Sequence, residues 1–225
     1  MKDAERLLAL KYGETWIDEG MAYRGGDRSL PVPISLIVYL IEADNRVILV
    51  DAGCDDMPGF TLKHFASPVE ILRRAGYAPE DVTDLILTHA HYDHAEASHY
   101  FKNAVVHIAE EELAAAKRFL PDFLTVQPFK EETCPACGVR AVKIGGHSHG
   151  SAVVEVSFGG RTHVICGDEC YVRRCLEEKI CTGASVCPEK SMAFLEKYGT
   201  GAYVTHLCHD GAILPGQNGV WEIKG

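Results

Sequence analysis

Thr88-His89-Ala90-His91-Tyr92-Asp93-His94 is the most informative stretch of this sequence, because it holds four metal-capable side chains within six residues. It follows a short apolar run that predicts a buried strand. Side chains alternate along an extended stretch, so His89 and His91 point to the same side and can reach one ion. Asp93 and His94, at the turn into the next element, can reach a second ion beside it. Imidazole with carboxylate favours zinc, manganese or iron(II) over calcium or magnesium. The alternative, a surface histidine tract, is disfavoured by the position directly after a strand.

The elements predicted around this stretch indicate two sheets faced by helices. Apolar and β-branched runs predict strands at 7–12, 14–17, 34–42, 46–50, 84–88, 153–158, 162–166, 202–205 and 220–223. Helices are predicted from Ser67, which opens a capping box with Pro68 at the first helical position, to 74, and at 109–119, 171–178 and 188–198. Hairpins rather than strict strand–helix alternation favour this arrangement over a doubly wound parallel sheet.

Length and charge limit the classes of function. A chain of 225 residues predicts a single domain over 1–225. Its formal charge of −10 and its sparse basic pairs, such as Arg73-Arg74 and Arg173-Arg174, disfavour nucleic-acid binding. The charged start of the chain lacks the apolar stretch of a signal peptide, and the longest apolar run, 34–41, is too short to span a bilayer. We therefore expect a cytoplasmic protein that does not bind membranes.

The nine cysteines are an odd number at irregular spacings, which argues against a disulfide framework and for reduced thiols. Cys134 and Cys137 have the C-x-x-C spacing of a redox pair or of half a zinc knuckle. The second half of a knuckle is not clear, because the best-spaced pair, His206 and His209, includes a histidine with another predicted role. A side role for Cys134 and Cys137 stays open.

The H-x-H-x-D-H stretch resembles the signature of the metallo-β-lactamase superfamily. Four further motifs follow the family's order: Asp51-Ala52-Gly53 resembles D-T-G, Gly146-His147-Ser148-His149-Gly150-Ser151 resembles G-H-T-x-G-S, Cys166-Gly167-Asp168 resembles the strand-end G-D, and Leu207-Cys208-His209-Asp210 resembles the terminal G-H-D. Together they span 51–210. The resemblance implies an α+β fold, a four-layer αβ/βα sandwich.

The resemblance also implies a ligand set for two metal ions. His89, His91 and His147 would hold the first ion. Asp93, His94 and His209 would hold the second, with Asp168 between them. We expect two zinc ions, with manganese or iron as alternatives. Two cations roughly 3.5–4 Å apart make a bridging water acidic enough to give hydroxide near neutral pH. Asp51 would orient a ligand histidine, or serve only as a turn-forming residue.

The reaction is narrowed by two positions. The flavodiiron branch carries Glu where this chain has His91, which disfavours an oxygen or nitric oxide reductase. Asp168-Glu169-Cys170-Tyr171 is similar to the N-acyl-homoserine lactonase branch, in which the phenol lies over the metals. Tyr171 would stabilise an oxyanion, or else only begin a helix and pack. Asp93 would pass a proton to the leaving alkoxide. The sequence thus predicts a lactone or related ester hydrolase that uses a metal-bridging hydroxide on a small molecule, and we expect a homodimer.

Two departures from the family pattern bear on the substrate. Ala95-Glu96 stands where the family usually has Gly, and a carboxylate so close to the metals would repel anionic substrates. Cys208 replaces the common Gly before the last histidine and predicts a thiol near the site. Two other functions remain open. A glyoxalase II-like thioester hydrolase would need basic residues for its substrate. A mononuclear iron persulfide dioxygenase shares H-x-H-x-D-H but leaves some later ligands unused.

Overall fold

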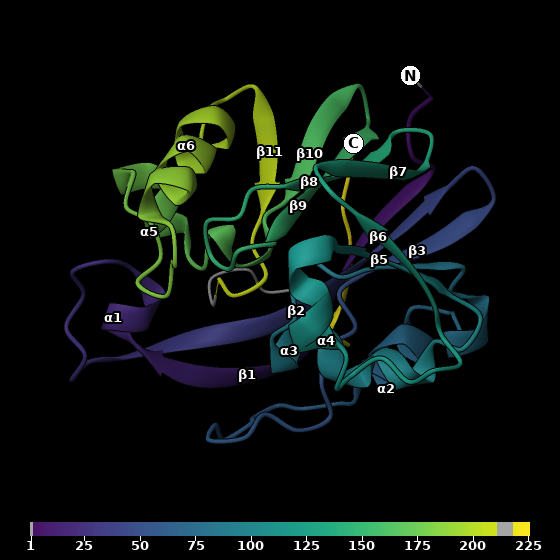
Figure 1. Ribbon diagram of the computed structural model, residues 1–225, viewed down its shortest axis with the longest axis horizontal. Helices are drawn as coiled ribbons and strands as arrows, with labels where there is room; N and C mark the ends of the chain where they lie inside the picture. The colour runs from purple at the N-terminus through teal and green to yellow at the C-terminus, as the bar shows by residue number, and fades with distance from the viewer. Residues whose placement is uncertain (1, 211–217) are drawn as a thin grey trace.

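Two β-sheets form the centre of the molecule in this computed structural model, which describes residues 2–210 and 218–225 (Figure 1). The seven-stranded sheet has the order β12 (Val220–Glu222), β1 (Arg6–Asp18), β2 (Pro31–Ala43), β3 (Arg46–Val50), β4 (Asp84–Ile86), β5 (Val105–Ala109) and β6 (Thr125–Phe129). The five-stranded sheet has the order β11 (Tyr203–His206), β10 (Arg161–Ile165), β9 (Ala152–Phe158), β8 (Val139–Lys143) and β7 (Glu132–Ala136).

Alternation along the strands divides the core into two parts. Leu7 and Ala9 of β1 pack with Val154 and Val156 of β9 between the two sheets. The intervening residues of β1, such as Leu8, belong to the larger cluster on the helical sides of the sheets. Because successive side chains of a strand point to opposite faces, each sheet buries both of its faces.

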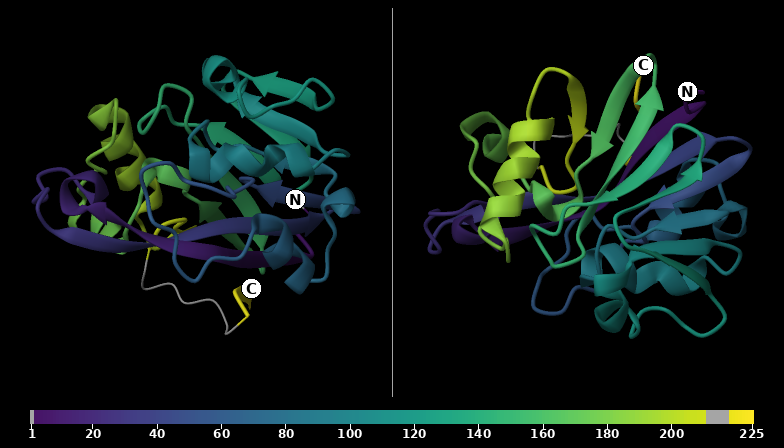
Figure 2. Two further views of the ribbon diagram at one scale, coloured as in Figure 1. Left: turned by 90° about the horizontal axis from the view of Figure 1, so that it is seen from below. Right: turned by 45° about the horizontal axis from the view of Figure 1, so that its top comes forward.

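Helices cover the outer face of each sheet (Figures 1 and 2). The helices are α1 (Glu19–Ala22), α2 (Pro68–Arg74), α3 (Tyr92–Ala95), α4 (Leu113–Ala116), α5 (Arg173–Glu178) and α6 (Pro188–Tyr198). The 3₁₀ turns are η1 (Pro79–Asp81), η2 (Glu96–Tyr100), η3 (Glu110–Glu112) and η4 (Gly167–Glu169). Helices α2 to α4 lie on the side of the seven-stranded sheet, and α5 and α6 lie beside the five-stranded one. This arrangement confirms the predicted four-layer αβ/βα sandwich.

Several local predictions differ from the structure. The helix predicted at 109–119 is replaced by the end of β5, the turn η3 and the single helical turn α4. Strands β5, β6, β7 and β8 were not predicted. All nine cysteines are free thiols. Within the described ranges, no third metal-capable side chain joins Cys134 and Cys137, so the zinc-knuckle interpretation finds no support. No described helix has the length and apolar content needed to cross a bilayer.

Candidate metal centre

Strand ends from both sheets bring the candidate site together. His89 and His91 follow β4 of the seven-stranded sheet, and Asp93 and His94 lie in α3 directly after them. From the five-stranded sheet, Asp168 lies in η4 after β10 and His209 follows β11. Strands β10 and β11 are parallel, so their carboxyl ends meet at the same edge. The loop between β8 and β9 supplies His147 there.

The first group of donor atoms comprises His89, His91, His147 and Asp168, whose ligand atoms lie within 4.8 Å of one another. His91 Nδ1 is 2.9 Å from His89 Nε2 and 3.0 Å from His147 Nε2. Asp168 Oδ2 lies 3.4 Å from His89 Nε2 and 3.3 Å from His147 Nε2. A tetrahedral ion with bonds of 2.0–2.1 Å places its ligand atoms about 3.3 Å apart. The separations in this group fit such an ion.

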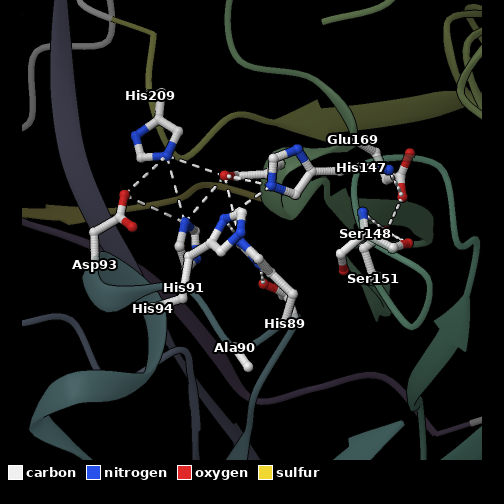
Figure 3. Close-up of polar contacts among 12 residues, drawn as sticks. His89, Ala90, His91, Asp93, His94, His147, Ser148, Ser151, Glu169 and His209 are labelled. Atoms are coloured by element: carbon white, nitrogen blue, oxygen red, sulfur yellow. Dashed lines mark hydrogen bonds and ion pairs between the residues drawn. The ribbon is translucent and has the colours of Figure 1, made fainter. Parts of the chain in front are cut away.

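The second group comprises Asp93, His94 and His209, again within 4.8 Å of one another (Figure 3). His94 Nε2 and His209 Nε2 are 3.4 Å apart, and Asp93 Oδ2 lies 3.6 and 3.4 Å from them, respectively. Asp168 Oδ1 lies 3.0 Å from each of these two nitrogens. Asp168 therefore directs one oxygen to each group, and the structure brings all seven predicted side chains to one place.

The charges around Asp168 are strongly coupled. Burial alone would raise the pKa of the Asp168 carboxyl, but the surrounding histidines, His94 foremost, hold it well below its ordinary value. Burial lowers the pKa of His147 to about 4 and that of His89 well below its ordinary value. The first group thus combines an ionised carboxylate with neutral imidazoles at His89 and His147, whose lone pairs are free to bind a cation. In the second group, burial would lower the pKa of His94 and His209, but the nearby carboxylates, Asp168 foremost, raise both above the ordinary value, so a cation there would displace a proton.

Asp51 lies beneath the second group and contacts a predicted ligand directly. Its Oδ2 accepts a hydrogen bond from His94 Nδ1 at 2.7 Å, which leaves His94 Nε2 facing the centre. Its carboxylate also accepts the backbone N–H of Thr88 at 2.7 Å and the Thr88 hydroxyl at 2.9 Å. The backbone of Asp51 has a φ of 63°, a left-handed conformation that Asp tolerates better than most residues. These contacts favour the orienting interpretation of Asp51.

Two buried glutamates that sequence reasoning missed hold the ligand loops. Glu112 Oε2 accepts the N–H of Ala90 at 3.0 Å, between His89 and His91. Its Oε1 accepts the hydroxyl of Ser148 at 2.7 Å and the N–H of Gly150 at 2.9 Å. Glu112 therefore connects the two loops that carry the first donor group.

Glu169 acts on the His147 loop from the other side, as Figure 3 shows. Its Oε1 accepts the N–H groups of Gly146 and His147 at 3.0 and 3.1 Å and also binds the Ser151 hydroxyl. Because Glu169 directly follows Asp168, the turn η4 carries one metal-donor side chain and also holds the loop of a second, His147, by hydrogen bonds.

A cavity of about 240 Å³ opens onto both donor groups. His91, Asp93, Asp168 and His209 line it together with Tyr171. Ile17, Met21, Ile34, Met57 and Phe60 form its apolar wall, and Tyr92 and Arg118 complete it on the side of α3 and α4.

The Tyr171 ring lies between two of the predicted ligands, with its centroid 5.0 Å from that of His209 and 5.7 Å from that of His147. Burial, together with the charges of Asp168 and Asp93, raises the pKa of the Tyr171 phenol well above its ordinary value. The phenol therefore keeps its proton at neutral pH and can donate a hydrogen bond into the cavity.

Two side chains expected near the site do not line the cavity. The Glu96 carboxylate accepts the backbone N–H of Asp55 at 2.8 Å and is not among the lining residues. The Cys208 side chain packs in the core between the sheets, where burial raises the pKa of its thiol well above the ordinary value. Glu96 therefore does not form the cavity wall. Cys208 does lie near the site, as predicted, because the charges of Asp51, Asp168 and Asp93 contribute to the raised pKa of its thiol.

Comparisons with known proteins agree with this geometry. A family model described as the metallo-beta-lactamase superfamily matches residues 38–186. The chain is 27% identical over 168 residues to an N-acyl homoserine lactonase of Bacillus cereus, covering 63% of this chain and 66% of that protein. It is 26% identical over 141 residues to the N-acyl homoserine lactonase AiiB of Agrobacterium fabrum, covering 51% of this chain and 50% of that protein. The matches thus span about half to two thirds of the length of these curated relatives.

A solved structure extends the likeness to nearly the whole fold. It is an N-acyl homoserine lactone hydrolase with the product N-hexanoyl-L-homoserine bound at its catalytic metal centre, and it superposes with a TM-score of 0.83 at 20% identity, covering 94% of this chain and 95% of that one. The family match includes the histidine motif, His147 and Asp168. By its sequence and its fold, the chain belongs to the metallo-β-lactamase superfamily.

Proposed function

We propose that this protein is a dinuclear-metal hydrolase that opens a lactone ring or a related ester. The convergence of seven donor side chains beneath one cavity carries the proposal. The names of the relatives, which are N-acyl homoserine lactonases, support the choice of substrate class. A cytoplasmic location and a homodimer remain part of the proposal.

The donor set fits two divalent cations. Asp168 Oδ1 is buried and makes no hydrogen bond with the described residues, although two imidazole nitrogens lie 3.0 Å from it. An ionised oxygen left without a hydrogen bond in the interior is costly unless a cation takes that place. His89, His91 and His147 would hold one ion, and Asp93, His94 and His209 would hold the other, with Asp168 offering one oxygen to each group. Zinc suits these nitrogen and oxygen ligands, and manganese or iron are the alternatives.

Divalent cations at this place would polarise a carbonyl group and lower the pKa of water toward neutrality. The protein itself supplies the remaining steps. Tyr171 donates its phenolic proton in a hydrogen bond to the oxygen that becomes negative as the carbonyl is attacked. Asp93, which lines the cavity, takes up a proton and returns it to the alkoxide that leaves when the ring opens. The apolar wall holds the acyl part and excludes water.

The same convergence favours this reaction over the iron dioxygenase alternative. That branch leaves some of the later ligands unused, whereas here His209 and Asp93 lie 3.4 Å apart within the second group. A complete second group favours a dinuclear hydrolase.

The test is metal analysis joined to a substrate panel. Protein stripped by a chelator is reloaded separately with zinc, manganese and iron(II). It is then assayed on acyl-homoserine lactones, simple aliphatic lactones, a glutathione thioester and glutathione persulfide. We expect two ions per chain and lactone opening. His91→Gln should lose metal and activity, and His64→Gln, which changes an exposed histidine outside the site, should keep both. Cleavage of the thioester alone, or persulfide oxidation with a single iron, would contradict the proposal.

A further inference from the structure

One cationic side chain lines the cavity beside the metal centre. Arg118 lies two residues after α4 and is exposed. Its guanidinium carbon is 5.1 Å from the ring centroid of Tyr92 and 4.5 Å from that of Phe119. The two rings contact each other edge to face at 5.0 Å. Because Tyr92 directly follows His91, the aromatic pair fixes the guanidinium next to the ligand motif.

The Arg118 guanidinium has no anionic partner among the residues that the structure describes. It forms no hydrogen bond or ion pair with any residue in 2–210 or 218–225, whereas Arg46 and Arg140, for example, each bind a carboxylate. Its five N–H donors are therefore free to bind a ligand. Acidic residues outnumber basic ones in this chain, which has a formal charge of −10, so an arginine at the cavity without an ion-pair partner is unexpected.

Arg118 is also the remaining charge of the cavity wall once the metal centre is accounted for. Asp93 and Asp168 belong to the donor groups, and the other described lining residues are apolar, aromatic or histidine. No carboxylate that could repel an anion is left, because Glu96 does not line the cavity. The expectation that the Glu96 carboxylate repels anionic substrates therefore loses its basis.

We propose that Arg118 is a specificity-determining residue and that the cavity takes acidic substrates, namely lactones or related esters whose acyl part carries a carboxylate. The reaction itself rests on the proposed function. A guanidinium binds a carboxylate through two parallel N–H···O hydrogen bonds, which are stronger than neutral ones. Stacking on Tyr92 and Phe119 restricts the side chain beforehand, so less conformational entropy is lost when the anion binds.

A binding experiment tests the inference without relying on turnover. Zinc-loaded protein is titrated by calorimetry with linear dicarboxylates from succinate to suberate, each against its monomethyl ester. One carboxylate can then occupy the metal centre while the other reaches Arg118. We expect that at the chain length that spans the two, the dicarboxylate binds roughly 10- to 100-fold more tightly than its ester.

The variants assign this preference to Arg118. Arg118→Met keeps an apolar stem on the aromatic pair and should abolish the difference between diacid and monoester. Arg118→Lys should keep part of it, because an ammonium attracts the anion but cannot form the two parallel hydrogen bonds. Lys117→Met removes the neighbouring exposed charge, which does not line the cavity, and should leave the difference intact. Equal affinity for diacid and monoester at every length, or an unchanged preference in Arg118→Met, would overturn the inference.

Kinetics then separates this inference from the proposed reaction. Lactones with an acyl chain ending in a carboxylate are compared with otherwise identical methyl-ended lactones. We expect a higher kcat/KM for the acidic lactone, and Arg118→Met should bring the ratio close to one through KM. If the diacid preference is found but no lactone is opened, the proposed reaction fails and the role of Arg118 stands. If both lactones are opened equally and diacids show no preference, the reaction stands and the role of Arg118 fails.

Discussion

Tyr171 is a buried phenol between His147 and His209. In the proposed reaction its hydroxyl donates a hydrogen bond to the oxyanion, and a single substitution can remove this hydroxyl. Tyr171→Phe should lower kcat by about 10²–10³-fold, the usual cost of losing one oxyanion donor. Metal content should not change, because seven other side chains supply the two donor groups. Steady-state kinetics with metal analysis of the same sample measures both. A variant with full activity would leave the reaction in place and exclude the phenol from it.

Asp168 carries the negative charge that both donor groups share. Asp168→Asn keeps the shape of the side chain but removes that charge, so both ions should bind more weakly. Competition with a chelator of known affinity measures the loss, with Asp122→Asn, an exposed site, as the control. Wild-type affinity for both ions in Asp168→Asn would show that the carboxylate does not bridge them.

For single residues, the sequence predicts the candidate metal ligands better than it predicts the residues that hold them in place. The spacing of the histidine motif and the ordered later motifs indicated every donor that the structure brings together. Glu112 was missed because it is the last of three consecutive glutamates, and the two before it are exposed. Arg118 was missed because a cation on a predicted helix looks like any solvated charge. Only the folded chain shows that Glu112 is buried and that Arg118 lines the cavity.

The turn η3 contributes to the site through Glu112, whose two oxygens accept from the loops of His89–His91 and His147. Glu112→Gln replaces one of those acceptors with an NH₂ group that faces a donor. Affinity for the first ion should fall by about 10- to 100-fold, the usual effect of disturbing the partners that orient metal ligands. Glu112 makes no hydrogen bond with the loops of the second group, so the affinity for the second ion should fall less than the affinity for the first.

A two-step metal titration resolves this difference between the sites. Glu111→Gln is the matched control, because its carboxylate binds the surface Lys143 instead. Equal weakening of both ions would mean that Glu112 supports the fold in general rather than one pair of loops.

Strands β3, β4 and β5 are joined by Asp84, whose Oδ1 lies 2.9 Å from His107 Nε2 and 2.9 Å from Arg46 Nη1. Burial alone would raise the pKa of the Asp84 carboxyl, but hydrogen bonds from His107, Arg46 and Thr83 hold it below its ordinary value of 3.8. A lowered folded-state pKa stabilises the protein fully above the unfolded value, and this contribution is lost as pH falls through the folded value.

Asp84→Asn should therefore lower the free energy of unfolding by about 1–3 kcal/mol at neutral pH. The gap to the wild type should narrow as the pH falls below 3.8. Urea unfolding of both proteins across this range measures it. A gap that does not change with pH would mean that the carboxylate's charge contributes nothing.

Element by element, the sequence predicted most of the buried strands, but not β5, and it predicted helices α2, α5 and α6, but not α1. It indicated β3 and α6 with their observed bounds, because an apolar, β-branched run and a proline at the helix start are local signals. The prediction from the sequence failed where tertiary contacts determine the secondary structure. Residues 109–119 favour a helix by composition, yet Ala109 is held in β5 by parallel pairing with Phe129 of β6. Strands β6 and β7 are largely exposed and each contains a proline, so neither shows the apolar alternation of a strand.

In the molecule as a whole, the donors come from both sheets, so bound ions would connect the two halves of the sandwich. A ligand that binds only the folded state stabilises it, by about 4 kcal/mol at a thousand times its Kd. Removing metal with a chelator should lower the Tm, and restoring zinc should recover it. Calorimetric melting curves at two zinc concentrations measure the shift. An unchanged Tm would contradict a built metal site.

His94 and His209 are 115 residues apart in the chain, although their Nε2 atoms are 3.4 Å apart in the fold. In an unfolded chain, closing such a loop has an entropic cost that grows with the logarithm of its length. Four donors, His89, His91, Asp93 and His94, lie within six residues and need almost no closure. A denatured chain would therefore keep a weak hold on one ion at this cluster and none on a second. The two ions should then stabilise the folded state by unequal amounts. The ion that remains bound to the denatured chain would keep the four ligands of the cluster close together when refolding begins.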